Sequence, residues 1–308
     1  MDRLTLMETF TKVAELGSFS RAAERLGLSR SVVSKYVSAL EDRLGARLVN
    51  RTTRRLSLTE VGESYLLRCQ AILADLEEAE QAAGDLHGAA RGTLRINAPM
   101  SFGFRHLAAA IPPFLAHHPG LGVDMTLDDR FVDLLDAGFD VAVRIGSLPD
   151  SSLIAVRLAP LHIVVCASPD YIKAQGAPER PEDLIGHNCL IYSLQRFGDL
   201  YPLVHAGSGE QVSVPVHGRF RANNGDALRA AAVAGGGVMI SPTFLCGDDL
   251  RAGRLVRLLA EWTGPAQGIN AVYPHNRHVS AKVRAFVDHL KGWCGKLPYW
   301  DEGVFPPP

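Results

Sequence analysis

The sequence predicts an α/β protein that begins with a small all-helical module and continues through one long helix. Three observations predict this fold class. Apolar residues recur at helical spacing in the first sixty positions, a 4-3-4-3 apolar repeat follows, and strand-like and helix-like stretches then alternate almost to the end. At 308 residues the chain is long enough for two or three domains with substantial cores.

The composition is that of an ordinary globular protein. Hydrophobic residues make up 47% and charged residues 21%, which excludes disorder and a fibrous repeat. No apolar run approaches the roughly 18 residues that span a bilayer, and charges occupy the place of a signal peptide's apolar region. We therefore expect a cytoplasmic protein. Five cysteines, odd in number and without a CxxC pair, indicate reduced thiols rather than disulfides or a cysteine-type zinc site.

The net charge of −1 conceals an asymmetry along the chain. Residues 1–60 carry a net charge of +4, residues 61–90 a net charge of −5, and residues 91–308 none. Within the first segment, residues 28–55 hold seven basic residues against Glu41 and Asp42. A local basic patch on a neutral protein indicates nucleic acid contacted by one module only.

Three short helices are predicted in the first 45 residues. Apolar residues at helical spacing predict a first helix that stops at Gly17. Ser20 can cap a second helix over 21–26, and Ser29 can cap a third that runs to about Leu44. Two short helices joined by a glycine turn, the second starting with small polar and basic residues, match a helix-turn-helix.

The third helix and the segment after it carry the expected DNA contacts. Small serines and basic residues can share one solvent face that enters a major groove, and the arginines that follow can reach phosphates or the minor groove from a β-wing. The alternative is a helical hairpin with a solvated basic face. The expected DNA-binding residues are Ser20, Arg21, Arg30, Ser31, Ser34, Lys35, Ser38, Arg51, Thr53 and Arg54.

A long helix is predicted from Glu60, capped by Thr59. Its apolar residues repeat with heptad spacing, which predicts a coiled-coil seam that holds two chains together. The seam residues are Tyr65, Cys69, Ile72, Leu76, Ala79 and Ala83. Leu66, Leu67 and Leu73 widen the apolar stripe, so the helix can instead pack on its own domain. On this seam Cys69 is interpreted as a small buried hydrophobe rather than a redox sensor.

Residues 18–66 resemble part of a known family. The segment SFSRAAERLGLSRSVVSKYVSALEDRLGARLVNRTTRRLSLTEVGESYL resembles the winged helix-turn-helix of LysR-type transcriptional regulators. The stretches RGTLRINAPMSFG, LPDSSLIAVRLAP, DALRAAAVAGGGV and HVSAKVRAFVDHL extend the resemblance along nearly the whole chain, particularly to the CrgA-like subgroup. The family often has Gln at the position of Arg30 and a basic-Gln pair at Lys35-Tyr36, so its base preference is not carried over.

The resemblance implies a two-lobed, periplasmic-binding-protein-like effector domain after the linker helix. The expected domains are a winged helix-turn-helix at 1–59, a linker and dimerisation helix at 60–90, an effector-binding domain at 91–295, and a tail at 296–308. Lobe I would combine 91–162 with 268–295, and lobe II would be 163–267. Strands are predicted at 94–98, 121–127, 139–145, 161–167, 238–241 and 269–273, and helices at 106–117, 132–136, 226–234 and 279–293.

A small-molecule site is expected between the lobes. Ligands of α/β sheets bind beyond the carboxyl ends of strands, and two helix N-termini facing one cleft favour an anion. Ser101 and Asn223 would contact it, unless they only cap their own helices. Arg144 is interpreted either as a carboxylate fork or as a structural salt bridge. The expected effector-binding residues are Met100, Ser101, Phe102, Gly103, Asp128, Arg144, Phe197, Asn223 and Met239.

We therefore expect a LysR-type DNA-binding regulator modulated by a small anionic or aromatic effector. Its partners would be that effector, a second copy in a homodimer or homotetramer, and double-stranded DNA with an interrupted palindromic operator, with no membrane. No catalytic arrangement, cofactor or metal site is read from the sequence, so an enzyme is not expected. One alternative is a solute-binding protein, but that function would not explain the basic N-terminal module. The other alternative is an architectural DNA-binding protein without an effector.

Overall fold

The computed structural model divides into two compact units, residues 1–89 with 133–138 and residues 90–132 with 139–308. The structure describes residues 2–51, 56–84, 90–134, 136–148, 153–195, 198–275, 279–295 and 297–305. Each unit is described by itself below. Among the described helices, none is both long and apolar enough to cross a membrane.

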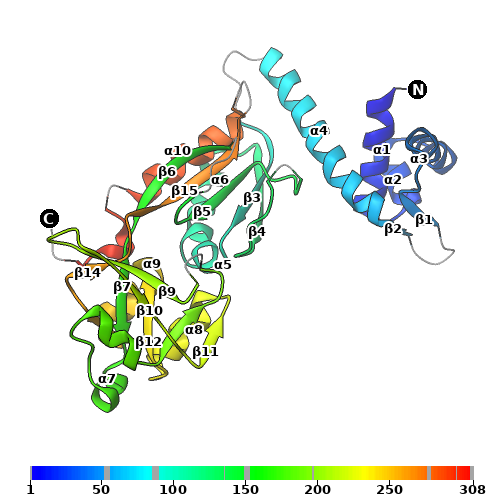
Figure 1. Cartoon of the computed structure of the whole chain (residues 1–308). Helices are drawn as coiled ribbons and strands as arrows, with labels where there is room; N and C mark the ends of the chain where they lie inside the picture. Colours follow the sequence, from blue (N-terminus) through cyan, green and yellow to red (C-terminus); the bar gives the residue numbers. More distant parts are fainter. Residues whose placement is uncertain are drawn as a thin grey trace. The chain divides into compact units, whose positions relative to one another are not determined.

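The N-terminal unit is a three-helix module followed by a hairpin and a long helix (Figure 1). The elements are α1 (Arg3–Leu16), α2 (Phe19–Leu26), α3 (Arg30–Leu44), β1 (Val49–Arg51), β2 (Leu56–Leu58) and α4 (Glu60–Gly84). Phe10, Val13, Val33, Val37 and Leu40 are fully buried at its centre. Their helical spacing is the pattern from which the first and third helices were predicted, and both helices are confirmed.

The predicted cap of the second helix is wrong by two residues. Ser18, not Ser20, has extended backbone, and its hydroxyl accepts a hydrogen bond from the Arg21 amide at 3.4 Å. Starting the helix at Phe19 lets that ring pack against the core shared by α1, α2 and α3. Apolar packing therefore decides between two serines that are equally good caps by local chemistry.

The first sheet of the second unit defines lobe I. It consists of β3 (Gly92–Ala98), β4 (Leu121–Leu127), β5 (Val141–Ile145), β6 (Leu153–Leu161) and β15 (Gln267–Pro274), in the order β4-β3-β5-β15-β6. β3 runs parallel to β4 and β5, whereas β15 is antiparallel to β5 and β6. The helices are α5 (Met100–Phe102), the π-helical turn η1 (Gly103–Leu107), α6 (Ala108–His117) and α10 (Ala281–Cys294).

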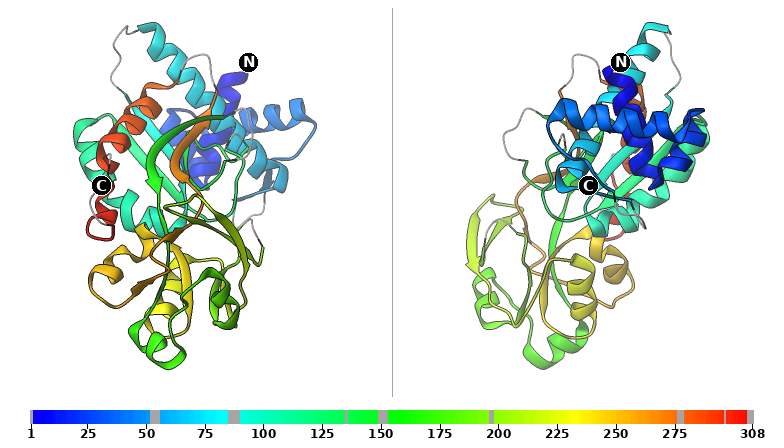
Figure 2. Two further views of the ribbon diagram at one scale, coloured as in Figure 1. Left: turned by 60° about the vertical axis from the view of Figure 1, so that its left-hand side comes forward. Right: turned by 90° about the vertical axis from the view of Figure 1, so that its right-hand side faces the viewer.

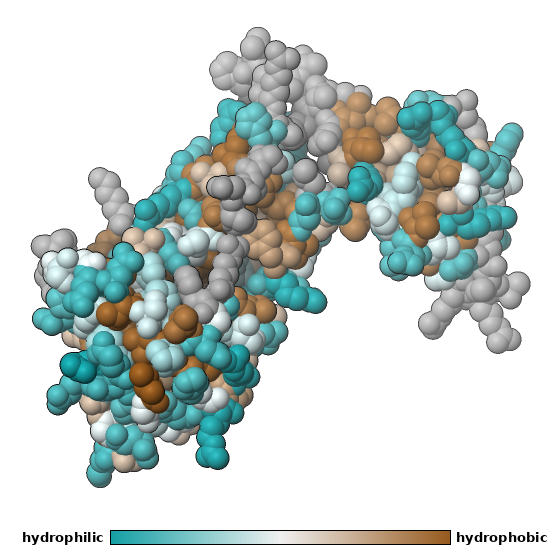
Figure 3. All heavy atoms as spheres, viewed as in Figure 1, coloured by the Kyte–Doolittle hydropathy of each residue, from teal (hydrophilic) through white to brown (hydrophobic). Residues whose placement is uncertain are grey.

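A second sheet defines lobe II. Its strands are β7 (Ile163–Ala167), β8 (Cys189–Tyr192), β11 (Phe220–Ala222), β12 (Val238–Pro242) and β13 (Val256–Leu258), in the order β11-β8-β12-β7-β13. A smaller sheet joins β10 (Gln211–Pro215), β9 (Leu200–His205) and β14 (Trp262–Thr263). The helices are α7 (Pro169–Gln175), the 3-10 turn η2 (Pro181–Gly186), α8 (Gly225–Val233) and α9 (Thr243–Arg251). Figure 3 shows a mostly hydrophilic face on this lobe, with a hydrophobic area over the smaller sheet.

The strand predicted at 161–167 is in fact two strands of different sheets. β6 ends at Leu161 and β7 begins at Ile163, so the chain passes from lobe I to lobe II at His162. The helix predicted at 132–136 is also wrong, because the described residues of that segment form only turn and irregular backbone. The segment is too short for a periodic pattern to distinguish a helix from a turn.

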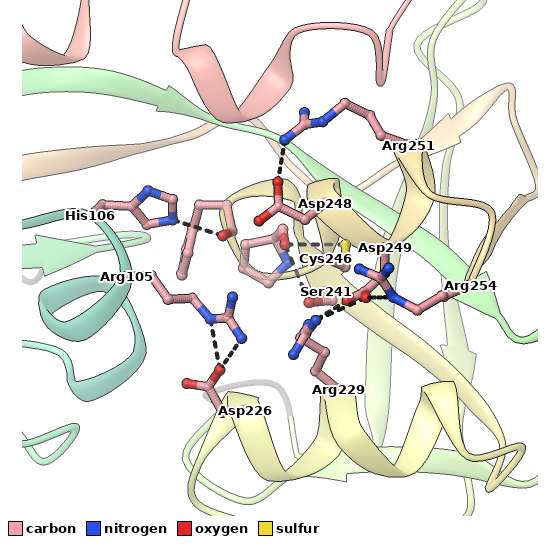
Figure 4. Close-up of polar contacts among 12 residues, drawn as sticks. Arg105, His106, Asp226, Arg229, Ser241, Cys246, Asp248, Asp249, Arg251 and Arg254 are labelled. Carbon is pink, nitrogen blue, oxygen red and sulfur yellow. Dashed lines mark hydrogen bonds and ion pairs between the residues drawn. The ribbon is translucent and has the colours of Figure 1, made fainter.

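Helices α8 and α9 are joined by ion pairs around a buried carboxylate (Figure 4). The Asp249 carboxylate is inaccessible to solvent. It accepts hydrogen bonds from Arg229 Nη2 at 2.8 Å and from Arg254 Nε at 2.6 Å. A buried carboxylate with two guanidinium partners is fully paired, so this cluster is a structural joint of lobe II.

Candidate functional site

The outer face of α3 carries basic residues and small serines, as the sequence predicts. The Ser29 hydroxyl accepts a hydrogen bond from the Val32 amide at 3.3 Å and caps the helix. Arg30, Ser31 and Lys35 are exposed, and Ser34 and Ser38 are half-buried. The opposite face is fully buried in the module core. The helix therefore presents two cations and small hydroxyl groups in a form that fits a major groove.

Helix α2 adds Ser20 and Arg21 to the exposed surface of the module. The guanidinium of Arg21 donates to the Leu16 carbonyl at the end of α1. Arg21 thus fixes the turn between the first two helices while its side chain stays exposed.

The hairpin after α3 is anchored to that helix by a buried carboxylate that the sequence analysis did not single out. Glu41 Oε1 accepts hydrogen bonds from the Leu48 amide at 2.9 Å and the Val49 amide at 3.1 Å, and Oε2 accepts from Arg47 Nη1 at 3.2 Å. β1 and β2 then pair antiparallel from Val49 and Leu58. Arg51 lies at the end of β1, whereas Thr53 and Arg54 lie outside the described residues.

The start of α4 is confirmed, but two of the six predicted seam residues, Tyr65 and Cys69, are not on its outer face. Thr59 Oγ1 accepts a hydrogen bond from the Gly62 amide at 2.9 Å and donates to the Arg47 carbonyl at 2.7 Å. Cys69 is fully buried among the helices of its own chain, and the Tyr65 ring lies 6.0 Å from that of Phe10. Cys69 therefore cannot contact a partner chain, because α4 covers the module core at this point.

Two of the predicted seam residues do face outward. Ile72 is 47% exposed and Leu76 is half-buried. The side chains of Ala79 and Ala83 lie outside the described part of the structure. Burial raises the pKa of the Cys69 thiol to about 11, which keeps it protonated and unreactive at neutral pH.

In lobe I, Ser101 stands out because its hydroxyl is buried without a hydrogen-bond partner in the described part of the chain. A Cβ atom placed on Gly225 would lie 3.5 Å from Ser101 Oγ, so this hydroxyl faces the first turn of α8 in lobe II. Buried polar groups are almost always paired. An unpaired hydroxyl where two lobes meet is the feature that a ligand contact would explain.

Around Ser101, carboxylates of the protein itself lie at the N-termini of both α5 and α8. Asp129 Oδ1 accepts a hydrogen bond from the Met100 amide at 2.9 Å, and burial raises the pKa of that carboxyl. Asp226, in the first turn of α8, pairs with Arg105 Nη2 at 2.5 Å (Figure 4). Negative charge is therefore already present at both helix N-termini, so the helix dipoles favour an anionic effector less than the sequence suggests.

Asn224 was missed by the sequence analysis, which selected its neighbour. Asn224 Oδ1 accepts a hydrogen bond from the Ala227 amide at 3.1 Å and caps α8, and its Nδ2 lies 3.4 Å from Met100 Sδ across the lobes. Asn223 is exposed and does not cap the helix. The two adjacent asparagines are indistinguishable in sequence, because only the backbone conformation decides which one is the cap.

Three other predicted site residues are structural. Met239 and Phe102 are almost fully buried in hydrophobic cores and do not line an open site, since β12 and α5 turn these side chains inward. A Cβ atom on Gly103 would lie 2.2 Å from Leu127 Cδ2, so this glycine permits close packing. Phe197 lies outside the described residues.

Arg144 does not form the predicted structural salt bridge with a described residue, whereas its role as a carboxylate fork for an effector stays a prediction. It is buried, and its Nη1 donates to Asn97 Oδ1 at 2.5 Å and to the Val143 carbonyl at 3.2 Å. Burial lowers the pKa of its guanidinium, although the charge of Asp128 opposes this effect. Asp128 itself pairs with Arg130, with Nη2 and Oδ2 3.0 Å apart. Arg144 is thus a buried cation on neutral acceptors.

His106 connects the π-helical turn of lobe I to lobe II. Its Nε2 donates to the Phe244 carbonyl at 2.8 Å, and its Nδ1 lies 2.6 Å from the Tyr299 hydroxyl. Figure 4 shows the ring at the edge of α9, beside the Arg105–Asp226 pair. A carbonyl only accepts, so Nε2 carries a proton and the neutral ring accepts at Nδ1 from Tyr299.

The second unit should lose stability in acid because of His106. Burial lowers the pKa of this histidine below 6.5, so the unfolded chain binds a proton that the folded chain does not. As pH falls below about 6.5, stability should decrease by up to about 1.4 kcal/mol per pH unit until the folded-state pKa is reached. Urea unfolding from pH 8 to 5 should show a shallower pH dependence for His106→Gln than for wild type. Equal slopes would contradict the assignment.

Comparison with known proteins agrees with this arrangement. Residues 4–63 match the family model of the bacterial regulatory helix-turn-helix protein of the lysR family, and residues 87–295 match that of the LysR substrate binding domain. An HTH-type transcriptional regulator of Xanthomonas campestris pv. campestris (strain 8004) is 41% identical, covering 91% of this chain and 82% of that protein.

Solved structures extend the comparison to the fold. CrgA, a LysR-type transcriptional regulator from Neisseria meningitidis, matches with a TM-score of 0.60 and 34% identity, over 95% of this chain and 99% of that one. The Vibrio cholerae virulence activator AphB matches with a TM-score of 0.58 and 30% identity, over 94% and 99%. The expected winged helix-turn-helix and two-lobed α/β fold class is thereby confirmed. The chain belongs to the LysR family of DNA-binding transcriptional regulators.

Proposed function

We propose that this regulator binds an operator of two half-sites as an oligomer, and that a small effector held near Ser101 modulates its operator binding. The observation that carries the effector site is the buried, unpaired Ser101 hydroxyl facing the start of α8. The exposed basic face of α3 supports the DNA contact. A protein that regulates chromosomal genes in this way works in the cytoplasm and needs no catalytic activity of its own.

We assign one role to each of the predicted domains 1–59, 60–90 and 91–295. The first would bind DNA, the second would join two chains through Ile72 and Leu76, and the third would bind the effector. The effector we propose offers a hydrogen-bonding group to Ser101. Because Asp129 and Asp226 already occupy the helix starts, a small carboxylate would have to displace Asp129 from the Met100 amide, whereas a neutral polar aromatic compound would not.

Replacing Arg30 by Ala tests the DNA-binding face. If Arg30 reads a base edge, the variant should lose about 1–3 kcal/mol of affinity for DNA selected by the wild-type protein from a random pool, and little affinity for unselected DNA. Lys173→Ala removes one exposed cation from lobe II and should bind both DNAs as wild type does. An equal loss on both DNAs would reduce Arg30 to a phosphate contact.

Ser101→Ala tests the effector site. Removing an unpaired buried hydroxyl should leave thermal stability unchanged or raise it, by up to about 1–3 kcal/mol. A thermal-shift screen of small carboxylates and aromatic metabolites finds compounds that stabilise the wild type. The variant should bind DNA normally but fail to respond to such a compound. A wild-type response of Ser101→Ala would show that the effector binds elsewhere, and a loss of stability would show that the hydroxyl is structural.

A further inference from the structure

The C-terminal segment beyond α10 is packed although it lies outside the matched family domain, which ends at residue 295. Its described residues 297–305 include the 3-10 turn η3 (Tyr299–Asp301). Trp300 is 3% exposed and Asp301 is 2% exposed. In Figure 2 this red segment lies where the two lobes meet. We call residues 298–305 the C-terminal strap.

The strap is part of the lobe I core. The Trp300 ring lies 5.6 Å from that of Phe102 and 4.7 Å from that of His106, in edge-on and tilted arrangements. The Tyr299 hydroxyl lies 2.6 Å from His106 Nδ1. Because Phe102 follows Ser101 directly, Trp300 supports from behind the turn that carries the unpaired hydroxyl.

The same segment is also held by lobe II. Arg251 Nη1, at the end of α9, donates to the Trp300 carbonyl at 3.1 Å and to the Glu302 carbonyl at 2.8 Å. A Cβ atom on Gly247 would lie 2.5 Å from the Trp300 carbonyl oxygen, so α9 approaches the strap backbone directly. The Phe305 ring lies 5.0 Å from the Arg257 guanidinium of β13.

The strap also contacts the first of the two places where the chain crosses between the lobes. His162 is the single residue between β6 of lobe I and β7 of lobe II. Its Nδ1 donates to Asp301 Oδ2 at 2.8 Å, and its ring lies 4.9 Å from that of Phe305. The Asp301 carboxylate is buried, whereas the His162 side chain is partly exposed, so the pair ties the buried strap to the lobe crossing.

We propose that the C-terminal strap fixes the angle between the two lobes and thereby positions Ser101 against α8. This segment binds lobe I through Trp300, lobe II through Arg251 and the crossing through Asp301, so any rotation of one lobe about His162 must break at least one of these contacts. The inference goes beyond the proposed function, since it concerns the lobe geometry with no effector present.

Distance measurement between two spin labels tests the strap in the full-length protein. All five cysteines are buried, so labels can be directed to exposed helix positions by Ala281→Cys on α10 of lobe I and Ala174→Cys on α7 of lobe II. Dilution with unlabelled chains removes distances between copies. The parent should give one narrow distance distribution. Asp301→Ala, Arg251→Ala and a chain truncated after Gly295 should each broaden it and add a population at a different distance.

Glu302→Ala is the matched control, because it removes an exposed carboxylate from the strap and leaves its backbone contact with Arg251 in place. It should give the parent distribution. The proposal is wrong if the Asp301→Ala and Arg251→Ala proteins both keep the distance distribution of the parent. Their circular dichroism spectra must equal that of the parent, which shows that both variants are folded. If the truncated chain fails to fold, these two substitutions still decide the outcome. Neither the distance measurements nor circular dichroism requires an effector, so a failure of this proposal can be told apart from a failure of the effector site tested by Ser101→Ala.

Discussion

The dimer that we propose to form through α4 is expected to separate into monomers when Ile72 and Leu76 are both replaced by Glu. Both residues lie one helical turn apart on the outer face of α4, and a symmetric pair of helices would bring four carboxylates together along one seam. Because two linked half-sites gain affinity through effective concentration, operator binding should fall by about 10²- to 10⁴-fold. Light scattering measures the oligomer, and titration of operator DNA measures the affinity.

Leu67→Glu is the control for this variant. Leu67 is also exposed on α4 but lies about half a turn around the helix from Leu76, so the same charge there should leave the oligomer intact. An intact oligomer in the Ile72→Glu, Leu76→Glu protein would show that other surfaces hold the chains together. Circular dichroism should show unchanged helix content in both proteins, because the Tyr65 and Cys69 contacts with the module core remain.

Gly62→Ala is expected to destabilise the N-terminal unit. An added Cβ would lie 2.0 Å from the Leu48 carbonyl oxygen. That carbonyl cannot move away freely, because it accepts a hydrogen bond from the Thr59 amide at 3.0 Å. Overpacking against fixed backbone costs about 1–3 kcal/mol or more, which exceeds the gain of about 1 kcal/mol from replacing a helical glycine. Calorimetry should show a lower melting temperature for this unit.

Gly292→Ala provides the comparison, because Gly292 is also helical and a Cβ there would meet no atom within 4 Å. This variant should gain up to about 1 kcal/mol from helix propensity. Equal effects of the two substitutions would show that the contact between α4 and Leu48 is not tight in solution.

Sequence periodicity predicted the helices of the first unit because their pattern is local. The same pattern does not predict whether an apolar face packs on its own module or on a partner chain. Tyr65 and Cys69 have heptad spacing, yet they pack on their own module, whereas Ile72 continues the spacing and faces outward. Phe102 and Met239 were expected to line the effector site, yet both are buried in cores. Burial in a core and lining of a cleft favour the same apolar residue types, so the sequence does not separate the two.

Contacts between segments that are distant in the chain were the hardest to predict from the sequence. Asp301 and His162 are separated by 139 residues, and the tail that carries Asp301 has neither helical nor strand periodicity. The choices between Ser18 and Ser20, and between Asn224 and Asn223, depend on where the backbone enters each helix. Such choices are made by tertiary packing and not by the chemistry of the capping side chain.

The Glu41 carboxylate has a consequence for the length of an operator half-site. Since one side chain of α3 accepts hydrogen bonds from the Leu48 and Val49 amides where β1 begins, the helix and the hairpin form one rigid body. On DNA, the bases under the helix and the phosphates or minor groove under the hairpin would then be at a fixed separation. One inserted base pair shifts them by about 3.4 Å and about a tenth of a turn, which this rigid body cannot follow. Half-sites should therefore tolerate base changes far better than insertions.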